Sequence, residues 1–228
     1  MGEWRNFTEI KKYARANKYD YDWIAENWMG PNPLYLAEEL CDNLDLRPGM
    51  RVLDMGCGKG CSSVFLAKEY GVTVFANDLW IPATENLRRF EAAGVSGSVY
   101  PIQAEAHALP YAEGFFDAAV SFNSYQYYGT CDLYFSRIFG KLVRQGGQFG
   151  AVINGLIDED GPPCEENTGA ICFHSGKWWR KHWEKTGLVR ITACYDFDDP
   201  KSADEGQYIT EGFNPANYAL VVMTAVKL

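Results

Sequence analysis

The feature that most constrains this fold is a short segment with the sequence VLDMGCGKG, at Val52–Gly60. In it an apolar run ends in an acid and leads into a loop with glycine at every second position. The stretch Cys61–Tyr70 then predicts a helix that Gly71 ends. Glycine adopts positive φ without strain and leaves the backbone bare, so a ligand can lie against such a loop. Open α/β sheets bind their ligands there, beyond the carboxyl ends of the strands.

Strands and helices alternate along the rest of the chain, with turn signals between them. The expected strands are 51–55, 72–76, 97–102, 116–122, 148–153, 188–195 and 218–226, and the expected helices are 7–19, 21–28, 33–44, 61–70, 84–93, 133–143 and 176–186. The alternation predicts right-handed crossovers and a parallel sheet covered on both faces. The last two strands, which flank a polar loop at 198–213, are expected to pair antiparallel at the sheet edge. An acidic loop at 158–168 is longer than most connections, which indicates a mobile or functional segment.

Composition limits the classes of function. The chain has 47% hydrophobic and 22% charged side chains, as folded proteins do. Its 21 basic and 30 acidic residues give a net charge of −9, which is the wrong sign for a nucleic-acid partner. No apolar stretch of membrane-spanning length occurs, and the polar N-terminus is unlike a signal peptide, so we expect a cytoplasmic protein without membrane contact.

Cysteine and histidine usage predicts neither disulfides nor a metal site. The seven cysteines contain no Cys-x-x-Cys pair, which fits reduced thiols, and the three histidines have no partner at a ligand spacing.

Two common nucleotide motifs do not fit the glycine segment. A dinucleotide fingerprint would need glycine at position 61, which is Cys61. A phosphate-binding P-loop would need Ser or Thr after Lys59, and Gly60 stands there. The glycine spacing therefore disfavours a nicotinamide-dependent oxidoreductase.

The segment instead resembles motif I of class I S-adenosylmethionine-dependent methyltransferases, a strand ending in an acid followed by Gly-x-Gly-x-Gly. Four later segments match the family in order. They are an acid that ends the second strand (Asp78), an acid before a small residue after the third (Glu105-Ala106), the fourth strand ending at Asn123, and a Leu-x-x-Gln-Gly-Gly turn at 142–147. Glu105 stands where the family usually has Asp, and Gln145 replaces its Pro. Within the family the chain most resembles small stand-alone methyltransferases, which are loosely similar to the ubiquinone and sterol methyltransferases and to the cyclopropane fatty acid synthases.

The resemblance implies a single α/β domain, 1–228. Its fold would be a Rossmann-like seven-stranded, mostly parallel sheet with helices on both faces, an antiparallel last strand and N-terminal helices. Residues 1–50 would form a helical cap, 51–154 the half that binds S-adenosylmethionine, and 155–228 the acceptor side.

The resemblance also implies the cofactor-binding residues. They are Trp28, Met29, Gly30, Asp54, Gly56, Cys57, Gly58, Gly60, Asp78, Leu79, Ala104, Glu105, Ala106 and Asn123. Asp54 would anchor either the donor's amino group or the loop itself, and Asp78 would accept the ribose hydroxyls. For Cys57 a small buried residue is the alternative, and for 28–30 a plain turn between helices.

Aromatic and histidine residues after the third and fourth strands are the candidates on the acceptor side. Tyr125 and Tyr127, in the run YQYY after the fourth strand, are expected to line the acceptor wall, because several buried hydroxyls would each need a partner. His107 is the candidate general base and His174 the alternative, although a soft nucleophile needs no base. Three tryptophans at 178, 179 and 183 are either core residues or a lid.

The leading hypothesis is methyl transfer from S-adenosylmethionine to a small molecule, driven mainly by positioning. The alternatives are a protein or lipid acceptor, or a protein that binds S-adenosylmethionine without turnover. The acceptor, the atom methylated and the oligomeric state are not readable from these residues.

Overall fold

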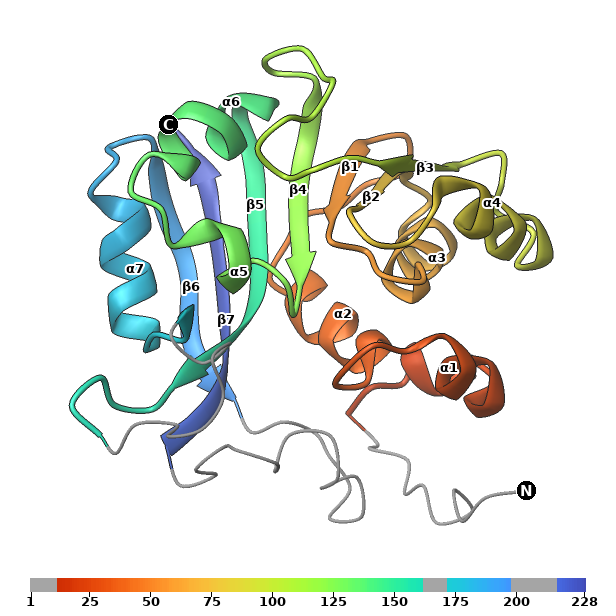
Figure 1. Ribbon diagram of the computed structural model, residues 1–228, viewed down its shortest axis with the longest axis horizontal. Helices are drawn as coiled ribbons and strands as arrows, with labels where there is room; N and C mark the ends of the chain where they lie inside the picture. Colours follow the sequence, from red (N-terminus) through yellow and green to blue (C-terminus); the bar gives the residue numbers. More distant parts are fainter. Residues whose placement is uncertain (1–11, 162–171, 198–216) are drawn as a thin grey trace.

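The computed structural model describes residues 12–161, 172–197 and 217–228, which form one seven-stranded sheet with helices on both sides (Figure 1). The strand order is β3-β2-β1-β4-β5-β7-β6. The strands are β1 Arg51–Met55, β2 Thr73–Asp78, β3 Val99–Gln103, β4 Phe116–Phe122, β5 Val143–Leu156, β6 Val189–Phe197 and β7 Tyr218–Lys227. Strands β1 to β5 are parallel, and β7 runs antiparallel to both β5 and β6. The predicted fold class is therefore confirmed.

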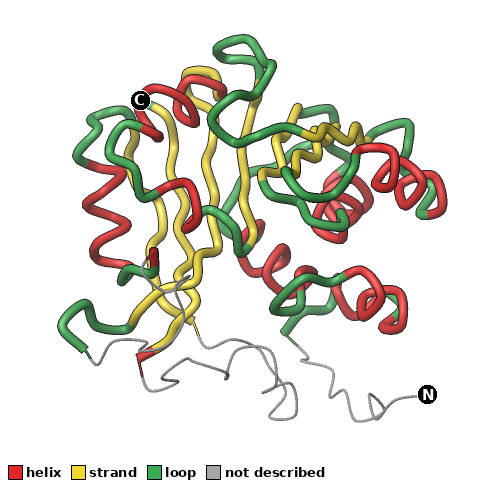
Figure 2. Tube along the Cα trace, viewed as in Figure 1, coloured by secondary structure: helices red, strands yellow, loops and turns green. Residues whose placement is uncertain are grey.

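Helices cover both faces of this sheet (Figure 2). They are α1 Tyr21–Asn27, α2 Pro33–Cys41, α3 Cys61–Tyr70, α4 Ala83–Ala92, α5 Gln126–Gly129, the π-helical η3 Phe135–Phe139, α6 Gly140–Leu142 and α7 Gly176–Glu184, after the 3₁₀ turn η2 Ala16–Lys18. Within the described ranges, no helix has the length and apolar character needed to cross a bilayer.

Alternate residues of the strands feed two separate cores. Val52 and Val120 face the side covered by α2 and α3, whereas Leu53 faces an aromatic cluster from η3 and α7. Trp183 of α7 is fully buried in that cluster. Strands that are apolar on both faces belong to sheets covered on both sides, as the sequence pattern predicts.

The strand order creates a topological switch point between β1 and β4, in the middle of the sheet. From β1 the chain runs outward through β2 to β3, and it then returns to place β4 on the other side of β1. The loops that follow β1 and β4 therefore leave in opposite directions and open a crevice between them, which is where such sheets bind ligands.

The structure differs from the sequence-based expectation at three elements. The described part of the first expected helix contains the short turn η2, and residues 1–11 lie outside the described range. The helix expected at 133–143 divides into η3 and α6. Strand β5 begins at Val143 rather than Gln148. Val143 already pairs with Phe116 of β4, and a bulge that contains Gly146, with φ of 70°, shifts the register before Gln148 pairs with Ala118. The loops at 158–168, in part, and 198–213 lie outside the described residues.

Candidate functional site

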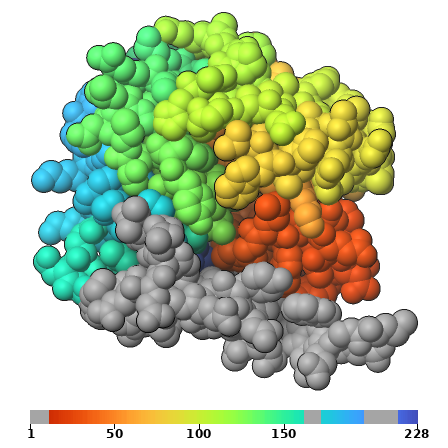
Figure 3. Space-filling model, viewed as in Figure 1, coloured from red at the N-terminus to blue at the C-terminus, as the bar shows by residue number. Residues whose placement is uncertain are grey.

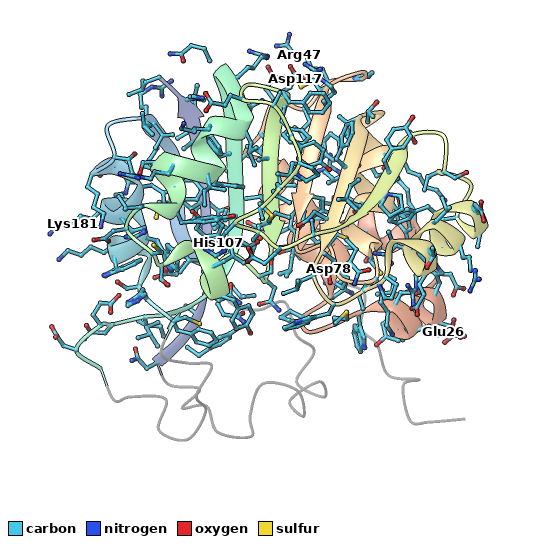
Figure 4. All side chains as sticks on the ribbon, turned by 45° about the horizontal axis from the view of Figure 1, so that its top comes forward. Glu26, Arg47, Asp78, His107, Asp117 and Lys181 are labelled. Carbon is cyan, nitrogen blue, oxygen red and sulfur yellow. The ribbon has the colours of Figure 1, made fainter. Side chains whose placement is uncertain are left out.

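A cavity of about 340 Å³ opens at the carboxyl ends of the central strands. Five segments line it: the turn between α1 and α2, the glycine loop after β1, the end of β2, the loop after β3, and the end of β4 with α5. Asp78 and His107 lie toward this end of the sheet, while Arg47 and Asp117 lie at the opposite end (Figure 4). In the space-filling view the N-terminal segment (orange-red) lies directly below the part of the chain that carries β2 and α4 (yellow; Figure 3).

The glycine loop supplies bare backbone to this cavity. Gly56 and Gly58 line it with φ of 70° and 54°, and Cys57 lies between them. A Cβ at position 56 would lie 2.1 Å from Ser124 Oγ, and one at position 58 would lie 3.1 Å from Met29 Sδ. Only glycine fits the loop in this conformation. Gly60, in contrast, begins α3 and faces the Phe90 ring, 2.4 Å from where a Cβ would lie.

Asp54 lies behind the loop rather than on the cavity lining. Its side chain is fully buried, and its Oδ2 accepts hydrogen bonds from Ser62 Oγ at 2.7 Å and Ser63 Oγ at 2.6 Å. Burial raises the pKa of Asp54 to about 6, against the two hydroxyl bonds, which favour the charged form. This geometry corresponds to the loop-anchoring interpretation, because Asp54 connects β1 to the first turn of α3.

Asp78, at the end of β2, does reach the cavity. Its Oδ2 accepts a hydrogen bond from Gly58 N at 2.8 Å, and its Oδ1 accepts bonds from Trp80 N at 2.8 Å and Ile81 N at 3.0 Å. The carboxylate thus holds the glycine loop and the turn after β2 together. The next residue, Leu79, is half exposed and also lines the cavity.

The loop after β3 contributes Ala104, Glu105, Ala106 and His107 to the lining. Glu105 accepts hydrogen bonds from the backbone N of His107 at 2.7 Å, and its other oxygen lies 2.8 Å from His107 Nδ1. The side-chain bond to His107 holds the pKa of Glu105 below its usual value. Because Glu105 fixes one ring nitrogen, His107 presents the other to its surroundings.

The turn between α1 and α2 closes the cavity from the N-terminal side, with Met29 on the lining. Trp28 packs edge-on against Tyr21, with ring centroids 6.1 Å apart, and is not part of the lining. Gly30 has a φ of 120° and faces Asn123, because a Cβ there would lie 2.6 Å from Asn123 Nδ2. Asn123 itself lines the cavity at the end of β4.

The tyrosines after β4 divide between core and cavity. Tyr125 is fully buried against Trp179 and Trp183 and does not reach the lining. Tyr127 is 56% exposed and lines the cavity. The lining also includes Tyr128, which the sequence analysis did not select. The helix α5, which begins at Gln126, points these side chains in different directions. A run of four residues was too short for the sequence to indicate which tyrosine faces the core and which faces the cavity.

Tyr128 belongs to a group of three hydroxyls. Its Oη lies 3.0 Å from Ser121 Oγ and 2.9 Å from Ser124 Oγ, and those two oxygens are 2.8 Å apart. Ser124 Oγ also donates to Met55 O at 3.0 Å. Burial raises the pKa of Tyr128 above its usual value, so the phenol keeps its proton at neutral pH.

The alternative base and the tryptophans lie away from the cavity lining. His174 stacks on Trp178 with ring centroids 3.8 Å apart, and its Nδ1 lies 3.3 Å from Glu159 Oε2. Trp179 and Trp183 are fully buried. Of the two interpretations of these tryptophans, the structure therefore corresponds to core residues for 179 and 183.

Comparison with known proteins identifies residues 52–147 as a match to a methyltransferase domain family. Phosphoethanolamine N-methyltransferase 1 of Triticum aestivum is 28% identical over 83% of this chain and 38% of its own length. A probable fatty acid methyltransferase of Pseudomonas putida is 34% identical over 48% of this chain and 28% of its own length. The chain thus spans less than half the length of these curated relatives.

Solved structures share the fold. Phosphoethanolamine N-methyltransferase 2 of Haemonchus contortus superposes with a TM-score of 0.70 and 18% identity, over 95% of this chain and 59% of that one. Geranyl diphosphate C-methyltransferase of Streptomyces coelicolor A3(2) gives a TM-score of 0.68 and 17% identity, over 84% and 76%. At these identities the likeness shows the fold alone. The matched methyltransferase domain encloses the glycine loop, Asp78, Glu105 and Asn123, the residues that carry the resemblance to class I S-adenosylmethionine-dependent methyltransferases.

Proposed function

We propose that this protein binds S-adenosylmethionine in the cavity at the carboxyl end of its sheet and transfers the methyl group to a small molecule. The observation that carries the proposal is the joint placement of the glycine loop and Asp78. Gly56 and Gly58 present bare backbone with a positive φ, Gly56 where a Cβ would clash with Ser124 Oγ, and the Asp78 carboxylate lies beside them. These residues fit a ligand that combines a flexible chain with a ribose.

Each wall of the cavity has a proposed part in donor binding. The amino-acid end would lie along Gly56–Gly58, and Asp78 would accept hydrogen bonds from the ribose hydroxyls. Leu79 and the loop Ala104–Ala106 would hold the adenine. Bound S-adenosylmethionine supplies a methyl group on a positively charged sulfur. The protein's own contribution is to hold the two reactants in line and to exclude water between them.

On the acceptor side we assign Met29, Asn123, Tyr127 and Tyr128 to the wall, in place of the buried Tyr125. Tyr127 is proposed to pack on the acceptor. His107 is proposed to take up a proton at Nε2, because Glu105 holds its Nδ1.

Cavity size supports a small acceptor. About 340 Å³ lies within the range of small-molecule sites, roughly 300–1,000 Å³. A lipid acceptor is the second candidate, because Met29, Leu79 and Trp80 line the cavity with 47%, 51% and 73% of their surface exposed. An apolar rim of this kind also suits an acyl chain that enters from a carrier.

The test is donor-dependent release of S-adenosylhomocysteine by the purified protein supplied with a small-molecule cell extract. We expect release with the wild type and at least a hundredfold less with Asp78→Ala. Arg47→Ala, at the opposite end of the sheet, is the control and should retain the wild-type rate. Binding of the donor without any release would support the binding-protein alternative, and the absence of binding would overturn the proposal. Release with acyl chains but not with the extract would favour the lipid acceptor.

A further inference from the structure

Asn123 has an unusual backbone for its place at the end of β4. Within the described ranges it is the only residue other than glycine with a positive φ, at 58°. Its N donates to Val152 O at 2.8 Å, and its O accepts from Gln126 Nε2 at 3.2 Å, so the neighbouring strand and α5 hold this conformation. Backbone strain that is held by its surroundings tends to occur at functional sites, because it places a side chain where a relaxed backbone would not.

The Asn123 side chain lies against a part of the chain that is distant in sequence. Its Nδ2 lies against the α-carbon of Gly30 in the turn before α2, where a Cβ would lie 2.6 Å away. Its Oδ1 is buried, and no described residue donates a hydrogen bond to it. Asn123 also lines the cavity. A buried amide oxygen is normally paired, so this one is a site for a donor group on a ligand.

The hydroxyls next to Asn123 are already committed to one another. Ser124 Oγ donates to Met55 O, and Tyr128 Oη is within hydrogen-bond distance of both Ser121 and Ser124. They hold the ends of β1 and β4 together. Among the buried side-chain oxygens on this wall, within the described residues, Asn123 Oδ1 is the one without a hydrogen-bond partner.

We infer that Asn123 Oδ1 accepts a hydrogen bond from the methyl acceptor and that the acceptor is an amine that attacks in its neutral form. This inference rests on the proposed function. An amide oxygen accepts a hydrogen bond but does not take the proton. A nucleophile bound to it must therefore attack while it still carries that proton. A neutral amine does so with its lone pair, whereas an alcohol or thiol must first be deprotonated.

The transfer balances without another reactant. The nitrogen lone pair forms the new N–C bond as the C–S bond breaks, and the electron pair of that bond returns to sulfur, which becomes a neutral thioether. The nitrogen gains the positive charge, which the Asn123 oxygen stabilises through the N–H bond, and the proton then passes to His107 Nε2, the base proposed above. The acids Asp78 and Glu105 on the lining, with the net charge of −9, attract an acceptor that is an ammonium ion in solution. That ion first loses one proton to solvent, which frees the lone pair for the attack.

A pair of substitutions separates the side-chain oxygen from the backbone turn. Asn123→Gly keeps a positive φ without strain but removes the oxygen, and Asn123→Asp keeps both the turn preference and an oxygen acceptor. With the extract at limiting concentration, we expect the Gly variant to lose roughly 10- to 100-fold of the rate of S-adenosylhomocysteine release. The Asp variant should stay within about fivefold of wild type, since a single hydrogen bond is exchanged rather than lost. Affinity for S-adenosylhomocysteine, measured by calorimetry, should be the same in all three proteins. A Gly variant with the wild-type rate would show that Asn123 serves only the turn and would overturn the role of its oxygen.

The amine itself is tested by treating the same extract with an acylating reagent that blocks primary and secondary amines. We expect the blocked extract to lose its ability to support release, while a mock-treated extract retains it. Release that survives blocking would overturn the amine assignment and leave the proposed methyl transfer intact. If the untreated extract supports no release, the proposed function itself fails, so the two failures are distinguishable.

Discussion

Asp54 and Asp78 are both acids at strand ends, yet they differ in environment. Asp54 is fully buried beneath the glycine loop and accepts two serine hydroxyl bonds, whereas Asp78 lies at the cavity and accepts backbone N–H bonds. The pKa of Asp54 rises to about 6 because burial disfavours its charge more than two hydroxyls favour it. Ionisation of Asp54 therefore lowers the free energy of unfolding, and this effect can be measured without any ligand.

Replacing Asp54 with Asn should change how stability depends on pH. An acid whose pKa is higher in the folded state favours folding when protonated, so its contribution falls as pH rises from its ordinary pKa of 3.8 to about 6 and stays low above that. The free energy of unfolding of Asp54→Asn relative to wild type should thus increase between pH 4 and pH 7.5, by up to about 3 kcal/mol. Urea unfolding at the two pH values measures this. Parallel pH curves for the two proteins would contradict the assigned burial.

The Tyr128 hydroxyl connects the segment after β4 to the end of β1, because it lies 3.3 Å from Met55 O and 2.9 Å from Ser124 Oγ, which also donates to Met55 O. Tyr128→Phe should therefore lower the free energy of unfolding by about 1 kcal/mol, since it leaves hydroxyl partners less well satisfied. It should also weaken S-adenosylhomocysteine binding several-fold, because the loop that carries Gly56 is less fixed. Tyr100→Phe is the matched control, since the Tyr100 hydroxyl is exposed and bonds Gly97 O at the far edge of the sheet. Equal effects of the two substitutions would count against the role of Tyr128.

At the scale of elements, α2 connects the N-terminal segment to the sheet. Two buried acids on this helix make the connection: Glu38 Oε2 accepts a bond from Ala16 N at 2.7 Å, and Glu39 Oε2 accepts one from Tyr13 Oη at 2.8 Å. Glu39 also binds Tyr195 Oη of β6 at 2.8 Å. These bonds fix α2, the helix that directly follows the turn with Met29 and Gly30.

The start of α2 offers a direct test of that arrangement. Asn32 caps the helix, with its Oδ1 accepting from Leu34 N at 3.0 Å, and both neighbours of Asn32 line the cavity. Asn32→Ala should lower the free energy of unfolding by about 1 kcal/mol and weaken S-adenosylhomocysteine binding. Asp20→Ala removes the corresponding cap of α1, away from the lining, and should affect stability but not binding. If S-adenosylhomocysteine binding weakened in both variants, or in neither, the Asn32 cap would have no specific role in shaping the cavity.

At the scale of the whole molecule, the cavity lies between elements that the two cores hold separately. One core lies on the face covered by α2 and α3, the other lies on the face covered by η3 and α7, and β1, β4, β5 and β7 contribute residues to both. The sheet holds the glycine loop, the end of β2 and the loop after β3 next to one another. A ligand that contacts all three segments binds only while the sheet is folded. Binding should stabilise the molecule as a whole.

We expect S-adenosylhomocysteine at about 100 times its dissociation constant to raise Tm by roughly 5–10 °C, because ligand binding at that ratio adds about 2.7 kcal/mol. Asp78→Asn should abolish most of this shift. It should also lower the Tm of the free protein, because the amide keeps one oxygen and its NH2 cannot accept from both Gly58 N and the pair Trp80 N and Ile81 N. Thermal unfolding followed by circular dichroism measures both values. A shift of equal size in Asp78→Asn would remove Asp78 from the donor site.

Much of the fold was predictable because it depends on local patterns. The exact limits of the first helix after β1 and of β4 follow from apolar runs bounded by glycine, and the order of alternation sets a parallel sheet. The helix expected at 133–143 was not predictable in detail, because its aromatic residues adopt a π-helical turn to fill the core against Phe149 and Trp183. That choice depends on partners far away in sequence.

By itself the sequence determined the sheet, the glycine loop and the resemblance to methyltransferases, since strand period, glycine positions and acids at strand ends are local and recur in order along the chain. Only the tertiary structure decided which of those residues meet a ligand. It placed Asp54 behind the loop and Tyr125 in the core, and it brought Tyr128 and the unpaired oxygen of Asn123 to the cavity. The physical reason is that burial and hydrogen bonding are set by contacts across the sheet, between segments that the sequence pattern leaves independent.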